Sequence, residues 1–80
     1  MHIVKNFRYI KDYQLLLTFE DEKSKLVDLK DHLEGEIFAP LKNITYFKKI
    51  MLNQDLDTIM WENGADVSPD FLYDIGYEIK

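Results

Sequence analysis

The amino-acid sequence predicts an α+β domain in which antiparallel strands come first and short helices follow. Three segments before residue 30 are rich in β-branched and aromatic residues, which favour strands. The helix-start signals lie after residue 28, and this separation of strands from helices is typical of α+β folds. Leu, Ile, Val and Phe make up 26 of the 80 residues, enough for a folded chain with a thin core. We therefore expect one domain over residues 1–80.

The first three strands are expected at 2–10, 13–20 and 24–29. The second strand alternates, and its apolar face consists of Tyr13, Leu15, Leu17 and Phe19. The pair Lys11–Asp12 is expected to form a tight turn, and the polar run 20–23 precedes the third strand. Three strands joined by tight turns predict an antiparallel meander.

Helical structure is expected to begin near Asp28 or Lys30. Leu29, Leu33 and Ile37 recur four residues apart, and Gly35 limits this segment to a short helical turn. Because a proline disfavours helical geometry in the residue before it, Ala39 is expected to be extended. A short helix is then expected over 44–50, with Asn43 as its N-cap and an apolar face of Ile44, Phe47 and Ile50.

The remaining elements are a further strand pair and a C-terminal helix. Met51–Leu52 and 57–61 are the expected strands, connected by 53–56. The helix start has Ser at the N-cap, Pro at the first helical position and an acid in the first turn, namely Ser68, Pro69 and Asp70. Phe71, Leu72 and Ile75 are its expected apolar face, and Gly76 is expected to end it in a left-handed conformation.

The charge is unevenly distributed along the chain. The net charge is −5, but residues 1–52 carry +1 and residues 53–80 carry −6. The acids of that last part are Asp55, Asp57, Glu62, Asp66, Asp70, Asp74 and Glu78. They should repel nucleic acid and anionic membranes, and six scattered cations (Lys5, Arg8, Lys11, Lys42, Lys48 and Lys49) are interpreted as solvated surface. We expect no direct binding of nucleic acid or membrane.

Several classes of site are excluded by composition. The chain has no cysteine, so it forms neither disulfides nor thiolate metal sites. It has no apolar run of about 20 residues and no signal-peptide pattern at its start, so we expect a soluble, cytoplasmic protein. Glycines at positions 35, 64 and 76 alone cannot build a phosphate-binding loop. No cofactor is predicted.

Enzymatic activity is not expected either. Ser24 and Ser68 have no histidine or lysine base at a recognisable spacing, and His2 is expected in a frayed terminus. The densest cluster of metal-ligand residue types is Asp28, Asp31, His32, Glu34 and Glu36. A zinc or hard-cation site there would need three or more converging ligands, whereas Gly35 interrupts the helix, so we interpret the cluster as a solvated acidic turn.

The last third of the chain contains a run of residues that resembles the signature of a known family. The pattern W-x-N-G-A-D-x-x-P-x-x-L-Y is matched at every named letter, by Trp61, Asn63, Gly64, Ala65, Asp66, Pro69, Leu72 and Tyr73. Similar matches occur at Leu15 to Phe19, Asp28-Leu29, Phe38-Ala39-Pro40-Leu41 and Phe47. The chain thus resembles the small bacterial domain-of-unknown-function family numbered 2442. It departs from the family at Glu62, where proline is usual, and in the turn 20–23, which lacks the usual glycine.

The resemblance implies a short α+β protein with no established biochemical activity. Members of that family are often encoded beside another small protein, in an arrangement that resembles toxin–antitoxin pairs. Some are fused to a helix-turn-helix segment, which is not expected to follow this domain. Any contact with DNA is therefore expected to need a partner.

The run from Trp61 to Asp66 supports two interpretations. In the structural one, Asn63-Gly64 is a turn, Trp61 caps the core and Asp66 accepts hydrogen bonds from nearby amides. In the functional one, Trp61, Asn63 and Asp66 form the walls and polar contacts of a pocket. We favour the structural interpretation, because a lone motif of this composition is a weak functional signal.

Two functional hypotheses follow. The first is a non-catalytic protein-interaction module that binds a small basic partner, in which the acidic residues Asp70 and Asp74 and the aromatic Tyr73 contribute; this module could be the neutralising half of a two-gene pair. The surplus of tyrosines and the exposed strand edges of a meander also favour pairing, either with a second copy as a homo-oligomer or with another chain. The second is a domain that binds a small ligand or a metal at the Trp61–Asp66 corner.

Overall fold

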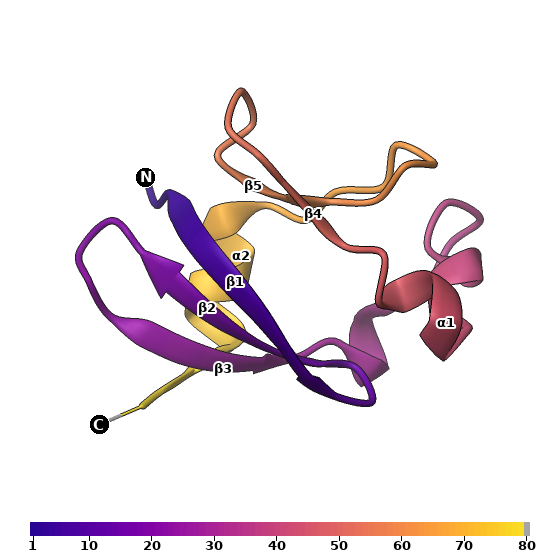
Figure 1. Cartoon of the computed structure of the whole chain (residues 1–80), viewed down its shortest axis with the longest axis horizontal. Coiled ribbons are helices and arrows are strands. Elements are labelled where there is room, and N and C mark those ends of the chain that lie inside the picture. Colours follow the sequence, from indigo (N-terminus) through magenta and orange to yellow (C-terminus); the bar gives the residue numbers. More distant parts are fainter. Residues whose placement is uncertain (80) are drawn as a thin grey trace.

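The computed structural model describes residues 1–79 and confirms the α+β fold (Figure 1). One antiparallel sheet has the strand order β1-β2-β3-β6, and β4 and β5 form a separate hairpin. The strands are β1 (Val4–Lys11), β2 (Gln14–Phe19), β3 (Ser24–Asp28), β4 (Met51–Asn53), β5 (Thr58–Met60) and β6 (Tyr77–Glu78). The helices are the 3-10 helices η1 (Lys30–His32) and η2 (Ala39–Lys42) and the α-helices α1 (Ile44–Phe47) and α2 (Pro69–Ile75). Within residues 1–79, no helix is long and apolar enough to cross a membrane.

The predicted meander of β1, β2 and β3 is confirmed, with a small shift of its first turn. Lys11 still pairs with Gln14, so the turn consists of Asp12 and Tyr13 rather than Lys11 and Asp12. Asp12 has a φ of +47°, a backbone conformation that aspartate adopts more readily than most residues. The predicted alternation of β2 is also confirmed, because its inner side chains are fully buried: Leu15, Leu17 and Phe19.

Strand β1 is an edge of the sheet and begins irregularly. Its register with β2 shifts between Val4 and Asn6. The side-chain Oδ1 of Asn6 accepts a hydrogen bond from the amide of Phe7 at 2.9 Å. The amide of Val4 donates to the carbonyl oxygen of Asp57 at 2.9 Å, which attaches the β4–β5 hairpin to the start of β1.

The helical turn predicted after β3 is confirmed as the 3-10 helix η1. Leu29 and Leu33 on either side of it are buried, but Ile37 is exposed and does not share their face. The reason is Gly35, whose φ of +94° redirects the chain before Ile37. The extended backbone expected for Ala39 is wrong, since Ala39 begins η2. Pro40 fits the first turn of this helix, where a missing amide N–H removes no helical hydrogen bond.

The predicted N-cap of the next helix is confirmed. Oδ1 of Asn43 accepts hydrogen bonds from the amides of Thr45 (2.9 Å) and Tyr46 (3.4 Å). Helix α1 ends at Phe47 rather than at residue 50, because the chain turns there to enter β4. Phe47 and Ile50 are buried as expected, whereas Ile44 lies at the surface.

The strand pair β4–β5 and the start of α2 agree with the sequence, but two details of α2 do not. Ser68 stands at the N-cap position, yet its side chain makes no capping hydrogen bond. Phe71, expected in the core, is 39% exposed, whereas Leu72 is fully buried. Successive helical residues point about 100° apart, so a helix that directs Leu72 at the sheet turns Phe71 away from it.

The end of α2 differs from the prediction, and the difference explains why residue 76 is glycine. Gly76 is extended, with φ −76° and ψ 153°, so the expected left-handed helix end is wrong. A Cβ at this position would lie 2.9 Å from Cβ of Lys25 and 3.1 Å from Cγ2 of Val27. Glycine is therefore required for close approach to β3. The next residues form β6, a strand not predicted from the sequence, which pairs antiparallel to β3.

The core lies between the sheet, α2 and the α1 region. It is a single cluster of buried side chains: Val4, Leu15, Leu17, Phe19, Val27, Leu29, Leu33, Leu41, Phe47, Ile50, Ile59, Trp61, Ala65 and Leu72. Helix α2 covers one face of the sheet and lies behind the strands in Figure 1. The opposite face of β1, β2 and β3 carries no helix among the described residues.

Candidate functional site

The Asn63-Gly64 turn predicted between β5 and α2 is a three-residue hairpin loop. The amide of Gly64 donates to the carbonyl oxygen of Trp61 at 3.0 Å, and the amide of Trp61 donates to that of Ala65 at 2.9 Å. Gly64 has a φ of +90°, as in a type I turn followed by a left-handed residue. Met60 and Asp66 form a bridge beyond the loop, so the predicted corner is a short hairpin extension of β5.

Asn63 fixes this loop and attaches it to a distant segment. Its Oδ1 accepts a hydrogen bond from the amide of Ala65 at 3.0 Å, and its Nδ2 donates to the carbonyl oxygen of Ile37 at 2.9 Å. The sequence interpretation gives the amide-accepting role to Asp66 instead. Within residues 1–79 the side chain of Asp66 accepts no amide hydrogen bond, because Asn63 is already bound to the loop amide.

Trp61 belongs to the core. Its side chain is 0% exposed, its Nε1 donates to the carbonyl oxygen of Phe47 at 2.9 Å, and its ring lies 5.5 Å from the Phe47 ring. Ala65 and Leu72 of the same signature are also buried. The geometry therefore matches the structural interpretation of Trp61, and this ring does not form a wall of an accessible pocket.

A groove of about 410 Å³ lies next to the loop, between η1 and the start of α2. We call it the acidic groove, and its lining is Leu29, Asp31, His32, Leu33, Glu34, Phe38, Asp66, Val67, Ser68 and Phe71. Of the residues proposed from the signature, only Asp66 lines it. Asp31, His32 and Glu34 belong to the acidic cluster noted in the sequence, but their meeting with residues 66–71 was not predicted, because the groove joins segments far apart in the chain.

The groove combines an apolar floor with acidic edges. Phe71 packs edge-on against the ring of His32, with centroids 5.1 Å apart and an interplanar angle of 83°. Three exposed carboxylates, of Asp31, Glu34 and Asp66, line the groove, and no lysine or arginine is among its described lining residues.

His32 and Ser68 both line the groove, an arrangement that the sequence spacing did not indicate. No hydrogen bond joins the two side chains in the described structure, and the His32 ring contacts Phe71 instead. Within residues 1–79, no group of three or more His, Cys, Asp or Glu side chains is arranged to hold a metal ion. The acidic cluster predicted at 28–36 is thus distributed between this groove and the solvent.

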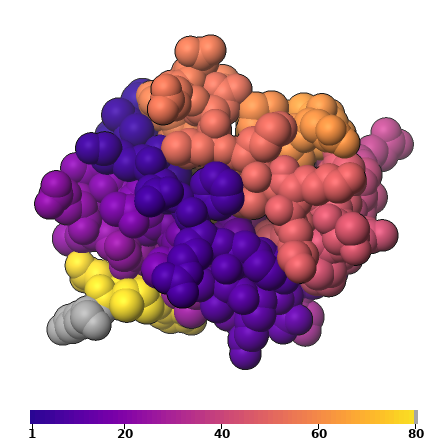
Figure 2. Space-filling model, viewed as in Figure 1, coloured from indigo at the N-terminus to yellow at the C-terminus, as the bar shows by residue number. Residues whose placement is uncertain are grey.

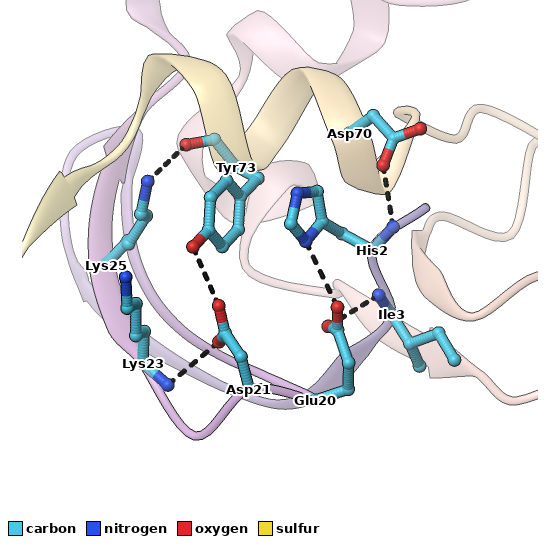
Figure 3. Close-up of polar contacts among 8 residues, drawn as sticks. All are labelled: His2, Ile3, Glu20, Asp21, Lys23, Lys25, Asp70 and Tyr73. Carbon is cyan, nitrogen blue, oxygen red and sulfur yellow. Dashed lines mark hydrogen bonds and ion pairs between the residues drawn. The ribbon is translucent and has the colours of Figure 1, made fainter.

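A second polar cluster lies at the other side of α2 (Figure 3). We call it the N-terminal clasp, and it consists of His2, Ile3, Glu20, Asp21, Asp70 and Tyr73. The ring of His2 stacks on that of Tyr73, with centroids 3.6 Å apart and an interplanar angle of 6°. Its Nδ1 lies 3.1 Å from Oε1 of Glu20, and its amide donates to Oδ1 of Asp70 at 2.7 Å. The expected fraying at His2 is therefore wrong, because these contacts hold the segment in place.

Three ionisable groups of the clasp, those of Glu20, Asp21 and Tyr73, have shifted pKa values with identifiable causes. The hydroxyl of Tyr73 donates to Oδ2 of Asp21 at 2.7 Å, which lowers the pKa of Asp21 and raises the pKa of Tyr73. The amide of Ile3 donates to Glu20 at 2.8 Å and lowers the pKa of Glu20. The nearby carboxylate of Glu78, at 3.8 Å, raises the pKa of Lys23.

Tyr73 is the centre of the clasp. Nζ of Lys25 lies 3.6 Å from the centroid of the Tyr73 ring and donates to the Tyr73 carbonyl oxygen at 2.7 Å. The structure therefore separates the site residues proposed from the sequence into distinct places. Asp70 and Tyr73 belong to the clasp, Asp66 lies at the groove, and Asp74 lies at the surface of α2.

Comparisons with known proteins agree with the resemblance noted in the sequence. No curated protein and no solved structure matches the chain. The model of one family, described as a protein of unknown function (DUF2442), matches residues 4–78, which include the hairpin loop, the whole lining of the acidic groove and all six strands. On this match the chain belongs to the DUF2442 family.

Proposed function

We propose that this protein is a non-catalytic protein-interaction module that binds a basic partner in the acidic groove. The observation that supports this most directly is Phe71, a large aromatic side chain left 39% exposed beside a groove with three carboxylates. Exposed apolar grooves with polar edges are typical of surfaces that bind another protein.

The chemistry of the groove indicates what the partner presents to it. The apolar floor of Leu29, Leu33, Phe38 and Val67 accommodates an aliphatic or aromatic side chain, and burial of such an anchor supplies most of the affinity of many interfaces. The carboxylates around the floor attract lysine or arginine next to that anchor. The expected ligand is therefore an apolar side chain flanked by basic residues.

The arrangement of genes implied by the family resemblance gives a first partner to test. If a small basic protein is encoded in the adjacent reading frame, this chain would be the neutralising, antitoxin-like half of the pair. The net charge of −5 favours rapid association with such a protein, because opposite charges steer two proteins together.

The test measures association of the two purified proteins against ionic strength. The variant Glu34→Gln/Asp66→Asn removes two charges from the groove, and Asp55→Asn/Asp74→Asn removes two exposed charges elsewhere as a matched control. We expect the groove variant to associate about tenfold more slowly at low salt. The control should change the rate much less, because its charges lie outside the groove. Asp70 is left intact in both, since its carboxylate binds the His2 amide.

Equal effects of the two variants would contradict the assignment of the groove, and equal rates for all three proteins would contradict a role for acidic charge altogether. Phe71→Ser adds an independent test. It should weaken binding with little change in the salt dependence, because it removes the apolar contact and leaves the carboxylates in place.

A small ligand is the second candidate occupant, because about 410 Å³ lies within the usual range of ligand pockets. A metal ion is the simplest form of this alternative. We expect zinc, magnesium and calcium to leave the melting temperature unchanged. An ion present at 100 times its dissociation constant would stabilise the fold by about 2.7 kcal/mol, so a clear upward shift would favour the ligand-binding alternative.

A further inference from the structure

The register of the four-stranded sheet places one residue of each strand in a single row across its outer face. Arg8 pairs with Leu16, Leu16 with Leu26, and Leu26 with Tyr77. Directly paired residues of antiparallel strands point to the same side of a sheet. We call these four residues the outer row. They point away from the core, because their neighbours along β2 and β3, such as Leu15 and Val27, are buried under α2.

The centre of the outer row is apolar, and the rows on either side of it are polar: Asn6, Thr18 and Ser24 in one, Gln14 and Asp28 in the other. Leu16 and Leu26 are partly buried, and Tyr77 is 74% exposed. Figure 2 shows β1, β2 and β3, in indigo and purple, at the surface of this face, with no helix over them. The hydroxyl oxygens of Thr18 and Ser24 lie 3.2 Å apart. The two leucines and Tyr77 form a contiguous apolar strip, which makes the outer face a candidate interaction surface.

We propose that the outer face binds a second copy of this chain about a two-fold axis that runs parallel to the strands, between β2 and β3. The order of residues in the outer row supports binding of a second copy. The axis places the row of one copy against the same row of the other copy in reverse order, and the facing residues are then complementary. Leu16 of one copy meets Leu26 of the second copy, so the two leucine pairs form the centre. At each end, the Arg8 guanidinium of one copy meets the Tyr77 ring of the other, a favourable cation–π arrangement.

The positive charge of Arg8, at one end of the row, favours the axis parallel to the strands over a two-fold axis perpendicular to them. A two-fold axis perpendicular to the strands would place β1 over β1, and the two Arg8 guanidinium groups would face each other. Like charges in contact at an interface oppose association. The parallel axis separates the two arginines by the width of the sheet.

The size of the face predicts the strength of the dimer. The four strands have eight, six, five and two residues. With a rise of about 3.4 Å per residue and a spacing of about 4.8 Å between strands, they cover roughly 300–400 Å² per copy. A standard interface covers about 800 Å² per copy, so this dimer should be weak and reversible, with micromolar or weaker affinity. The acidic groove is formed with α2 on the other side of the sheet, so self-association leaves it open to the proposed partner.

The test is sedimentation velocity of the purified chain from about 5 to about 500 µM, a range that brackets weak self-association. We expect a shift from monomer to dimer in the wild type. Leu16→Glu alone and Leu26→Lys alone should each weaken the dimer at least tenfold, because each places a charge against a leucine of the other copy. In a mixture of the two variants, the introduced glutamate of one copy faces the introduced lysine of the other. The remaining Leu26 and Leu16 face each other across the axis, so heterodimers should form.

Each result decides the proposal. A wild type that stays monomeric throughout the range overturns it, and so does a dimer that both single variants leave intact. Rescue in the mixture supports the parallel axis, whereas its absence contradicts that axis, since position 16 would then not face position 26. Leu56→Glu is the matched control, because Leu56 is 47% exposed in the β4–β5 turn and lies outside the sheet. Melting curves of every variant verify that the fold is retained.

Discussion

Helix α2 lies between two clusters, the clasp and the acidic groove, which differ in how firmly they hold an aromatic side chain of the helix. In the clasp, Tyr73 is held by a stacked histidine, an overlying lysine and a hydrogen bond to Asp21. In the groove, the ring of Phe71 meets that of His32 edge-on and remains 39% exposed. The two rings lie two residues apart on one short helix, yet one fastens the helix to the sheet and the other stays exposed. The clasp side of α2 therefore contributes to stability, and under the proposed function the groove side is the binding surface.

The largest expected difference in melting temperature is between the variants that truncate the two rings. Tyr73→Ala removes the stacking, the cation–π contact and the hydrogen bond together, and we expect the melting temperature to fall by about 10 °C or more. Phe71→Ala should lower it by about 3 °C or less, because that ring is already exposed. Thermal unfolding followed by circular dichroism measures both. Similar losses for the two variants would show that the groove is as much a structural element as the clasp.

Substitutions of two glycines, one where α2 meets β3 and one in the loop beside the groove, should change the free energy of unfolding by smaller amounts. Gly76→Ala should destabilise the protein by about 2 kcal/mol, because the new Cβ would collide with Lys25 and Val27 where α2 meets β3. Gly64→Ala meets no atom within 4 Å but forces alanine to a φ of +90°, so we expect about 1 kcal/mol. Gly64→Asn should recover part of the loss, since asparagine tolerates a left-handed backbone. Urea unfolding gives these values; an unchanged midpoint for Gly64→Ala would refute the turn assignment.

The smallest effect is a dependence of the protein's stability on pH that arises from the clasp. The folded pKa values of Glu20 and Asp21 lie below their ordinary values of 4.5 and 3.8. These carboxylates therefore stabilise the fold at neutral pH, and this contribution is lost as the pH falls from about 5 through the folded pKa values. The raised pKa of Tyr73 has the opposite consequence, so its contribution is present below about pH 10 and is lost as the pH rises through the folded value.

The variant Tyr73→Phe tests this pH dependence. It should reduce the loss of melting temperature in acid and abolish the alkaline loss that is due to Tyr73, whereas Tyr46→Phe should behave like the wild type. A Tyr73→Phe variant with unchanged acid and alkaline profiles would mean that the hydrogen bond between Tyr73 and Asp21 does not contribute in solution.

Local signals were enough to predict most of the fold. The Asn43 cap, the Pro69 helix start and the Gly64 turn each depend on residues within a few positions, so the sequence contains all the information that they need. The alternation of β2 likewise predicted which side chains are buried.

What could not be predicted depends on residues distant in the chain. Gly76 has the sequence pattern of a helix end, but its role is set by Lys25 and Val27, about fifty residues earlier. The clasp joins His2 to Asp70, and the groove joins His32 to Phe71. Neither contact has a spacing rule, and the pairing of β6 with β3 follows only once α2 is placed.

The irregular start of β1 has a consequence for how copies of this protein can meet. An open edge strand normally offers its amides and carbonyls to any other strand, which is how sheets grow into aggregates. Here the Asn6 side chain occupies the Phe7 amide, the register shift bends the strand, and the Val4 amide is bound to Asp57. Sheet extension from this end of β1 is therefore blocked, so growth into fibrils cannot start there.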